Sequence, residues 1–309
     1  MNGYQKRQMT LKHLLAGQGF HEAVTLSFYS AADLDRLHIP ADAPERKAIR
    51  ILNPISENLS IMRTTLAPSM LNIIVDNLKN GNSEGRLFEL ANVYIPYSLP
   101  LDRMPDERLA LCLGVFGPEE DFFTVKGAIE AIGQVTGLEF TYERAQVSYL
   151  HPGMTAAVIA NGKRVGVFGK LANDVTEELS LAKDDRTGRN IYLAELDYAA
   201  IDAMIDENYH YRPLNDHVEQ KRDLALICDE RVTVGEIEAC ILQASPLAVE
   251  AKLFDVYRGK NIGAGRKSMA FTVTLSDREK DVTDNAAQKA VHKILSNLKF
   301  KLGAELRQE

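Results

Sequence analysis

The sequence contains no tryptophan, few cysteines and no long apolar run. Its three cysteines, Cys112, Cys228 and Cys240, are odd in number, far apart and embedded in apolar stretches. This pattern predicts small buried side chains in a reducing compartment, and it contains no zinc or redox motif. No apolar run approaches the roughly 18 residues of a membrane span, and no secretory signal opens the chain. Together these absences favour a protein of the cytoplasm with no membrane segment.

Positive charge is also in short supply. The 309 residues carry a formal net charge of −7, which argues against a protein that coats nucleic acid without specificity. The charge is unevenly distributed, because residues 213–309 hold 15 Lys and Arg against 15 Asp and Glu, whereas the first 212 hold 21 against 28. Any contact with a phosphate backbone is therefore expected to be local and to lie in the tail.

The remaining composition is that of an ordinary globular protein, 45% hydrophobic and 26% charged, which is enough for two cores. Residues 206–213 (DENYHYRP) are polar and aromatic and include a proline, as is typical of a boundary between domains. We therefore expect one domain over residues 1–205 and a second over residues 213–309. No internal repeat or low-complexity tract interrupts either part.

The tail has a simple order of predicted elements. A strand over 222–228 is followed by a helix over 232–242, by strands over 249–256 and 267–275, and by a helix that Thr283 opens. The order β-α-β-β-α is typical of a ferredoxin-like split βαβ sandwich. The expected class is α+β, with a βαββαβ sandwich at the end of the chain.

The loop between the last two strands combines an aromatic side chain with cations on a backbone rich in glycine. Such a loop suits stacking on an unpaired base while the cations meet phosphates, although a solvated hairpin tip would have the same composition. A phosphate-binding P-loop is disfavoured because the segment leads from strand to strand, not to a helix. Two further cations begin the first strand of the same sheet. The candidate RNA-binding residues are Lys221, Arg222, Tyr257, Arg258, Lys260, Arg266 and Lys267.

The first part of the chain alternates short helices and strands. A helix is predicted over 6–18, a strand over 21–29, and a turn and helix over 53–80 in which Pro68 occupies the first helical turn. Strands follow over 86–95, 108–116, 139–143, 151–160 and 164–170, with a helix over 122–135, and a last strand and short helix over 190–201. Asn161-Gly162 predicts a two-residue hairpin turn.

Several phrases in both parts resemble the β subunit of bacterial phenylalanyl-tRNA synthetase. In the tail, LFDVYRG, GRKSMAFTVTL and the terminal LGAELR resemble its ferredoxin-fold anticodon-binding domain. In the first part, NPISENLSIMRTTLAPSML, DFFTVKGAIEAI and HPG at 151–153 resemble its class II synthetase-like module. The resemblance covers essentially the whole chain and implies an antiparallel class II synthetase-like sheet flanked by helices.

The resemblance also implies partners. A helix that leads into a long strand is similar to motif 1 of class II synthetases, which builds subunit interfaces in that family. It implies packing against the synthetase α subunit, in an α2β2 assembly, through the first helix and residues 62–78. For Arg63, a structural role that ties loops together is the alternative, as is usual for a buried arginine. The residues expected at the interface are Leu14, Leu15, Phe20, Met62, Arg63, Met70 and Ile74.

Catalytic residues are missing from the positions where the class II family carries them. The strand that matches 86–95 ends there with Arg and Glu, and the guanidinium grips the ATP α-phosphate. Here Ile95 and Tyr97 occupy these positions, and isoleucine cannot donate a hydrogen bond. The nearest segment to the third motif, 166–171 (GVFGKL), offers Lys170 but no arginine. We therefore expect no catalytic or metal-binding residue and no cofactor bound by this chain, with ATP and Mg used by the complete enzyme.

The sequence thus predicts a non-catalytic scaffold that packs on the α subunit and places the anticodon region of tRNA(Phe). The subunit's other modules, including the editing module, are absent, so Met1 is expected to begin a piece of a longer subunit or a truncated gene product. A free-standing amino-acid-binding regulator with a ferredoxin-like domain is the alternative from another class. A minimal enzyme is the third reading, and Ile95 opposes it.

Overall fold

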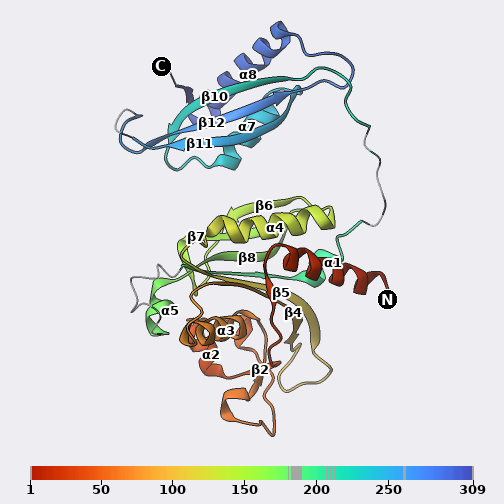
Figure 1. Ribbon diagram of the computed structural model, residues 1–309, viewed down its shortest axis with the longest axis vertical. Helices are drawn as coiled ribbons and strands as arrows, with labels where there is room; N and C mark the ends of the chain where they lie inside the picture. Colours follow the sequence, from red (N-terminus) through yellow and green to blue (C-terminus); the bar gives the residue numbers. More distant parts are fainter. Residues whose placement is uncertain are drawn as a thin grey trace. The chain divides into compact units, whose positions relative to one another are not determined.

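The computed structural model describes residues 2–179, 181, 190–206, 208, 211, 213–259 and 262–307. The chain divides into two compact units, Met1–Tyr209 and His210–Glu309. Helices and sheets occur in both units (Figure 1), so the predicted α+β class is confirmed. Among the described helices, none has both the length and the apolar character needed to cross a bilayer.

A seven-stranded sheet forms the centre of the first unit, in the order β1-β4-β5-β9-β8-β7-β6. Neighbouring strands are antiparallel except for the parallel pair β1 and β4. The strands are β1 (His21–Glu22), β4 (Gly85–Ile95), β5 (Asp106–Gly117), β6 (Phe140–Arg144), β7 (Leu150–Ala160), β8 (Lys163–Leu171) and β9 (Asn190–Leu196). The sheet is thus antiparallel, as predicted, except at the short parallel pair β1 and β4.

Helices cover both faces of this sheet (Figure 1). Helices α1 (Gly3–Gly17), α4 (Phe122–Thr136) and α6 (Tyr198–Asp202) pack on one face, and α2 (Ala31–Arg36) and α3 (Ala67–Lys79) on the other. Because side chains alternate along a strand, Leu111 and Leu113 of β5 enter the core under α1 and α4, whereas Cys112 enters the core under α3. Smaller elements complete the unit: β2 (Phe28–Tyr29), β3 (Ile61–Met62), α5 (Asn173–Glu178) and the 3₁₀ turns η1 (Pro44–Arg46) and η2 (Glu57–Leu59).

Local sequence signals explain where several elements begin and end. Asp121 caps α4 by accepting a hydrogen bond from the Thr124 amide at 2.8 Å. Asn161 and Gly162 have φ values of 49° and 73°, as the predicted two-residue hairpin turn requires. Gly114 allows α3 to approach β5 closely, since a Cβ there would lie 2.8 Å from Met70 Cγ. All three cysteines are free and buried, as predicted.

The predicted strand over 21–29 is wrong as a continuous element. Only β1 and β2 form at its ends, and they belong to different sheets. Between them, Thr25 makes no ladder bond: its amide and hydroxyl donate to the Glu89 carboxylate at 3.1 Å and 2.8–2.9 Å. A buried side-chain network therefore replaces strand pairing in this segment.

The second unit is the predicted ferredoxin-like sandwich. Its elements are β10 (Gln220–Asp229), α7 (Val234–Ala244), β11 (Ala248–Tyr257), β12 (Arg266–Leu275), α8 (Asp284–Leu302) and β13 (Glu305–Leu306). The sheet has the antiparallel order β11-β12-β10-β13, and both helices lie on one face of it (Figure 1). Thr283 caps α8, as expected, and Gly303 ends it at a φ of 60°.

Candidate nucleic-acid interface and the cleft of the first unit

The four-stranded sheet of the second unit has one face that α7 and α8 cover and one that no described helix of this unit covers. Leu224, Leu226 and Phe271 point from the covered face into the core. We call the opposite side the open face. By strand register it carries Lys221, Asp223, Ala225, Ile227, Lys252, Tyr257, Arg266, Ser268, Ala270, Thr272 and, beyond β13, Arg307.

A β-bulge turns Tyr257 onto the open face. Leu253 pairs with Phe271 on the covered side, but the register shifts between Leu253 and Asp255, so Tyr257 pairs with Ser268 on the open side. Without this extra residue, regular alternation would direct Tyr257 toward the same side as Leu253. The bulge thus places an aromatic ring on the uncovered surface.

Tyr257 is held from two directions. The Arg307 guanidinium lies 5.5 Å from the centroid of its ring, within the range of a cation–π contact. The Arg307 amide donates to the Ala225 carbonyl at 2.8 Å, which anchors the chain after β13 to β10. A Cβ at Gly259 would lie 2.3 Å from the Tyr257 hydroxyl oxygen and 2.5 Å from Cζ, so only glycine fits there without moving the ring.

The structure separates the predicted RNA-binding residues. Lys221, Tyr257 and Arg266 are exposed on the open face. Arg222 points to the covered side, where its guanidinium donates to Asp284 Oδ1 at 2.8 Å, because alternate residues of β10 face the helices. Lys260 lies outside the described residues.

The other two candidates meet at Glu230. Arg258 donates to Glu230 Oε1 from Nε at 3.0 Å and from Nη2 at 2.9 Å, and this contact holds the pKa of Glu230 below its usual range. Lys267 is only 9% exposed, and its Nζ donates to the Glu230 carbonyl oxygen at 2.9 Å. The Lys267 ammonium therefore offers no free surface to a ligand, since its position on β12 faces the helices.

Two features of this surface escaped sequence reasoning. Arg307 was not predicted, although it lies within the terminal phrase LGAELR, because only folding brings it over Tyr257. The bulge that directs Tyr257 outward has no local signal in LFDVYRG. Strand periodicity alone therefore could not assemble the pair.

In the first unit, most of the predicted interface residues are internal. Leu15, Phe20, Arg63, Met70 and Ile74 are buried in the chain's own interior. These side chains pack inside the first unit and present no surface to a partner. Leu14 and Met62 are partly exposed.

Large apolar side chains are exposed elsewhere, in the loops on either side of the small β2–β3 sheet. Val24 is 88% exposed and Leu26 is 59% exposed in the loop before β2, and Leu52 is 96% exposed and Ile55 is 87% exposed in the loop before β3. The antiparallel register of β2 and β3 places these two loops at opposite ends of the pair, and each loop exposes two large apolar side chains, as surfaces that bind partners do. We call these four residues the apolar loops.

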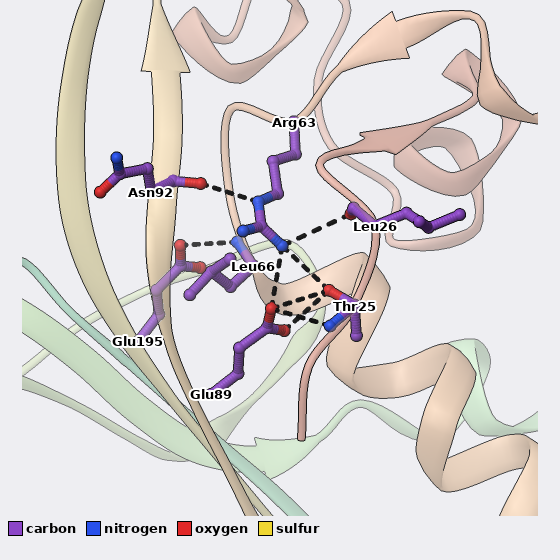
Figure 2. A network of polar contacts seen from close by, with 7 residues as sticks. All are labelled: Thr25, Leu26, Arg63, Leu66, Glu89, Asn92 and Glu195. Atoms are coloured by element: carbon purple, nitrogen blue, oxygen red, sulfur yellow. Dashed lines mark hydrogen bonds and ion pairs between the residues drawn. The ribbon is translucent and has the colours of Figure 1, made fainter. Parts of the chain in front are cut away.

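Arg63 ties loops together at the centre of a buried network (Figure 2). Its Nε donates to the Asn92 carbonyl at 2.7 Å, and its Nη1 donates to Thr25 Oγ1 at 2.9 Å and to Glu89 Oε1 at 3.0 Å. The side chains of Arg63 and Glu89 are 4% and 2% exposed. The pair thereby joins the loop before β2 to β4.

A cleft lies over the sheet beside this network. It consists of two adjoining hollows of about 410 and 460 Å³ that share lining residues from η1, β8 and β9. Ile95 of β4 and Arg108 of β5 both line it. The shared residues are Glu45, Thr64, Arg164, Gly166 and Glu195.

The polar groups of the cleft are mostly engaged within the chain. Arg108 donates to Asp106 Oδ2 at 2.6 Å and to Asp197 Oδ2 at 3.5 Å. Glu195 accepts from Thr65 Oγ1 at 2.5 Å and from the Leu66 amide at 2.9 Å (Figure 2 shows the latter), so it caps the start of α3. Burial raises the pKa of Glu195.

This chemistry does not fit ATP. The lining holds three carboxylates, Glu45, Glu195 and Asp197, against the two guanidinium groups of Arg108 and Arg164. A polyphosphate needs a positive field, and here carboxylates accompany both guanidinium groups, which already contact or face them. Lys170, the nearest cation of segment 166–171, is not among the lining residues.

The fold and the surface define a class: a sheet like that of the class II aminoacyl-tRNA synthetases, followed by a ferredoxin-like sandwich. Residues 1–198 match the model of the "Phenylalanyl tRNA synthetase beta chain CLM domain", and residues 217–307 match the "Ferredoxin-fold anticodon binding domain". The solved pyrrolysyl-tRNA synthetase of Desulfitobacterium hafniense has a similar fold, with a TM-score of 0.51 at 15% identity over 68% of this chain and 75% of that one.

The chain belongs to the family of phenylalanine–tRNA ligase beta subunits. It is 32% identical over 297 residues to the beta subunit of Clostridium acetobutylicum, which covers 95% of this chain and 36% of that one. The Clostridium tetani subunit is 34% identical over 299 residues, covering 95% and 36%. The Vibrio parahaemolyticus subunit is 32% identical over 329 residues, covering 99% and 40%. The chain thus spans a little over a third of the length of these relatives.

Proposed function

We propose that this chain is the tRNA-positioning, non-catalytic part of a phenylalanine–tRNA ligase. The second unit holds the anticodon region of tRNA(Phe), and the first packs on an α subunit, in an α2β2 assembly, that activates phenylalanine with ATP and Mg. The observation that carries the proposal is the Tyr257–Arg307 pair on the open face of a domain that matches an anticodon-binding family. Such a chain works in the cytoplasm, where tRNA is charged.

The open face suits unpaired bases better than a duplex. An exposed aromatic ring stacks on any base, and this is worth about 1–3 kcal/mol per base. Tyr257 is 41% exposed, so part of its ring is available while Arg307 holds it in place. Lys221 and Arg266 on the same face would meet the flanking phosphates. We assign RNA contact to these four side chains, with Arg258 at the rim and Lys260 left as a prediction.

For the first unit we propose that the apolar loops, with Leu14 and Met62, contact the α subunit. The four residues of the apolar loops are 59–96% exposed, which leaves apolar surface that a partner would bury. The five buried residues that were predicted for the interface hold the surrounding elements in place but do not contact the partner in this proposal. We propose no adenylation by this unit, because Ile95 and the carboxylates of the cleft replace the groups that would bind ATP.

We place the two functions in two domains, residues 1–205 and 213–309. The free-standing amino-acid-binding regulator is not favoured, because the first part of the chain matches a synthetase beta-chain domain and the second matches an anticodon-binding domain. Co-purification with an α subunit tests the assembly directly. A chain that remains alone in the presence of that subunit, or that exchanges pyrophosphate with ATP and phenylalanine by itself, would contradict the scaffold role.

A tyrosine substitution tests the proposed RNA site. We expect Tyr257→Ala in the full chain to weaken binding of a labelled tRNA(Phe) transcript by roughly 5- to 150-fold, the equivalent of about 1–3 kcal/mol. Tyr97→Ala is a matched control, since Tyr97 is 59% exposed and the Arg103 guanidinium lies 3.7 Å from its ring centroid in the first unit. Equal binding by both variants would refute the proposed site.

A further inference from the structure

Helix α8 carries a concentration of positive charge that the neutral tail as a whole does not have. Residues 285–302 contain Lys289, Lys293, Lys299 and Lys301 and no carboxylate. All four lysines are exposed. Cations in the last turn stabilise a helix through its dipole, which accounts for Lys299 and Lys301. It does not account for Lys289 and Lys293, which lie in the middle of the helix.

An aromatic side chain accompanies these cations. Phe300 is 89% exposed, although phenylalanine is normally buried. Lys289, Lys293 and Phe300 are four and seven residues apart, which places them along one side of the helix. Ile294 and Leu298 point into the core instead. We call Lys289, Lys293, Lys299 and Phe300 the basic face of α8.

Of the basic face, Lys299 reaches the edge of the open face, with Ser296 beside it on the helix between Lys293 and Phe300. A hollow of about 590 Å³ is lined by Lys299 and Leu295 of α8, by Glu305 and Leu306 of β13, and by Ile227 of the open face. The edge strand β13, which separates the two faces, is only two residues long. RNA that lies on the sheet can therefore cross this edge without meeting another described element of the unit.

Charge continues across the same edge. Lys299 donates to Glu305 at 3.0 Å, and this contact and, more weakly, the charge of Arg266 keep the pKa of Glu305 below its usual range. Arg266 belongs to the open face, so cations lie on both sides of the single carboxylate at β13.

We propose that the RNA-binding surface continues from the open face, around β13, onto the basic face of α8. Lys289 and Lys293 contact backbone phosphates, and Phe300 stacks on an unpaired base. An anionic protein surface would satisfy the lysines, but the repeated combination of an exposed aromatic with cations, at Tyr257 and at Phe300, favours RNA. The inference rests on the proposed function, because it extends the same tRNA contact.

The salt dependence of binding measures the phosphate contacts directly. Each phosphate contact contributes about 0.9 to the slope of log K against log salt for a duplex and about 0.7 for a single strand. We therefore expect Lys289→Gln/Lys293→Gln in the full chain to lower the magnitude of the slope for the tRNA(Phe) transcript by roughly 1.4–1.8. Lys47→Gln/Lys163→Gln, at two exposed lysines of the first unit, is the matched control and should leave the slope unchanged.

Phe300→Ala tests the stacking contact, with Phe123→Ala as its control because Phe123 is 70% exposed on α4. We expect a loss of roughly 5- to 150-fold for Phe300→Ala and no change for Phe123→Ala. All of these side chains are exposed, so circular-dichroism melting curves should coincide with wild type.

Two failures can be told apart. If the lysine pair leaves the slope unchanged while Tyr257→Ala still weakens binding, the extension onto α8 is overturned and the proposed function stands. If neither Tyr257→Ala nor the lysine pair changes binding, both are overturned. A reduced slope without any effect of Phe300→Ala supports the phosphate contacts and overturns the stacking contact.

Discussion

Removing Arg63 should leave a buried carboxylate without its cation. Glu89 is 2% exposed, and besides Arg63 its oxygens accept hydrogen bonds from the amide and hydroxyl of Thr25. Breaking a buried ion pair by removing one partner costs about 3–5 kcal/mol, because the other charge stays in a medium of low polarity. The Asn92 carbonyl would also lose its donor at 2.7 Å. We therefore expect Arg63→Met to destabilise the first unit by about 3–5 kcal/mol.

For a unit of this size, about 1 kcal/mol shifts the melting temperature by about 2–4 °C, so the transition of the first unit should fall by roughly 6–20 °C. Differential scanning calorimetry of the full chain measures this. The transition of the second unit provides an internal control, because the network lies wholly within residues 25–92.

A double-mutant cycle separates the ion pair from packing. Arg63→Met/Glu89→Met removes both charges, so it should destabilise less than the two single substitutions together predict. A loss below about 1 kcal/mol for Arg63→Met, or strictly additive single and double substitutions, would refute the argument.

Three further outcomes follow from other contacts. His38, at a φ of 49°, is paired with Glu178 and Asp174 of α5, which raise its pKa, so this contact stabilises the fold below about pH 6.5 and is lost as the pH rises through the raised pKa. His38→Asn, which tolerates the backbone angle, should remove a pH-dependent contribution of roughly 0.2–1 kcal/mol to the free energy of unfolding, measured by urea titration at pH 6 and pH 9. If the difference in stability between pH 6 and pH 9 is the same for the variant and the wild type, this expectation is contradicted. Gly259→Ala should displace the Tyr257 ring and weaken tRNA(Phe) binding nearly as much as Tyr257→Ala, whereas Gly235→Ala, with open space around it, should bind like wild type in the same titration. Ile95→Arg should not create pyrophosphate exchange, because the carboxylates of the cleft remain; measurable exchange would show that the missing guanidinium was the main defect.

Much of the fold followed from local patterns. The strands of the second unit, the start of α8 at Thr283 and the hairpin at Asn161-Gly162 depend on nearest neighbours and on alternation, so periodicity and turn chemistry predicted them. The segment over 21–29 did not follow, because the Arg63–Glu89 network lies far from it along the sequence.

The candidate surface was predictable in kind but not in detail. A cluster of cations with Tyr257 was visible in the hairpin, yet its members point in different directions once the strands pair. Lys267 turns inward to Glu230, whereas Arg266, its neighbour, turns outward. The lysines of α8 are visible in the sequence, but their proposed role in RNA binding depends on the hollow beside β13, which forms only in the folded unit.

The sequence by itself determined the order of elements, the two-part organisation it predicts and the absence of arginine at Ile95, because each is written in a single stretch of chain. Only the tertiary structure decided which face each side chain occupies. Side chains alternate with a period of two, so one bulged residue between Leu253 and Asp255 reverses the direction of Tyr257. Contacts between Arg307 and Tyr257, and between Arg63 and Glu89, arise only when segments distant in the chain pack together.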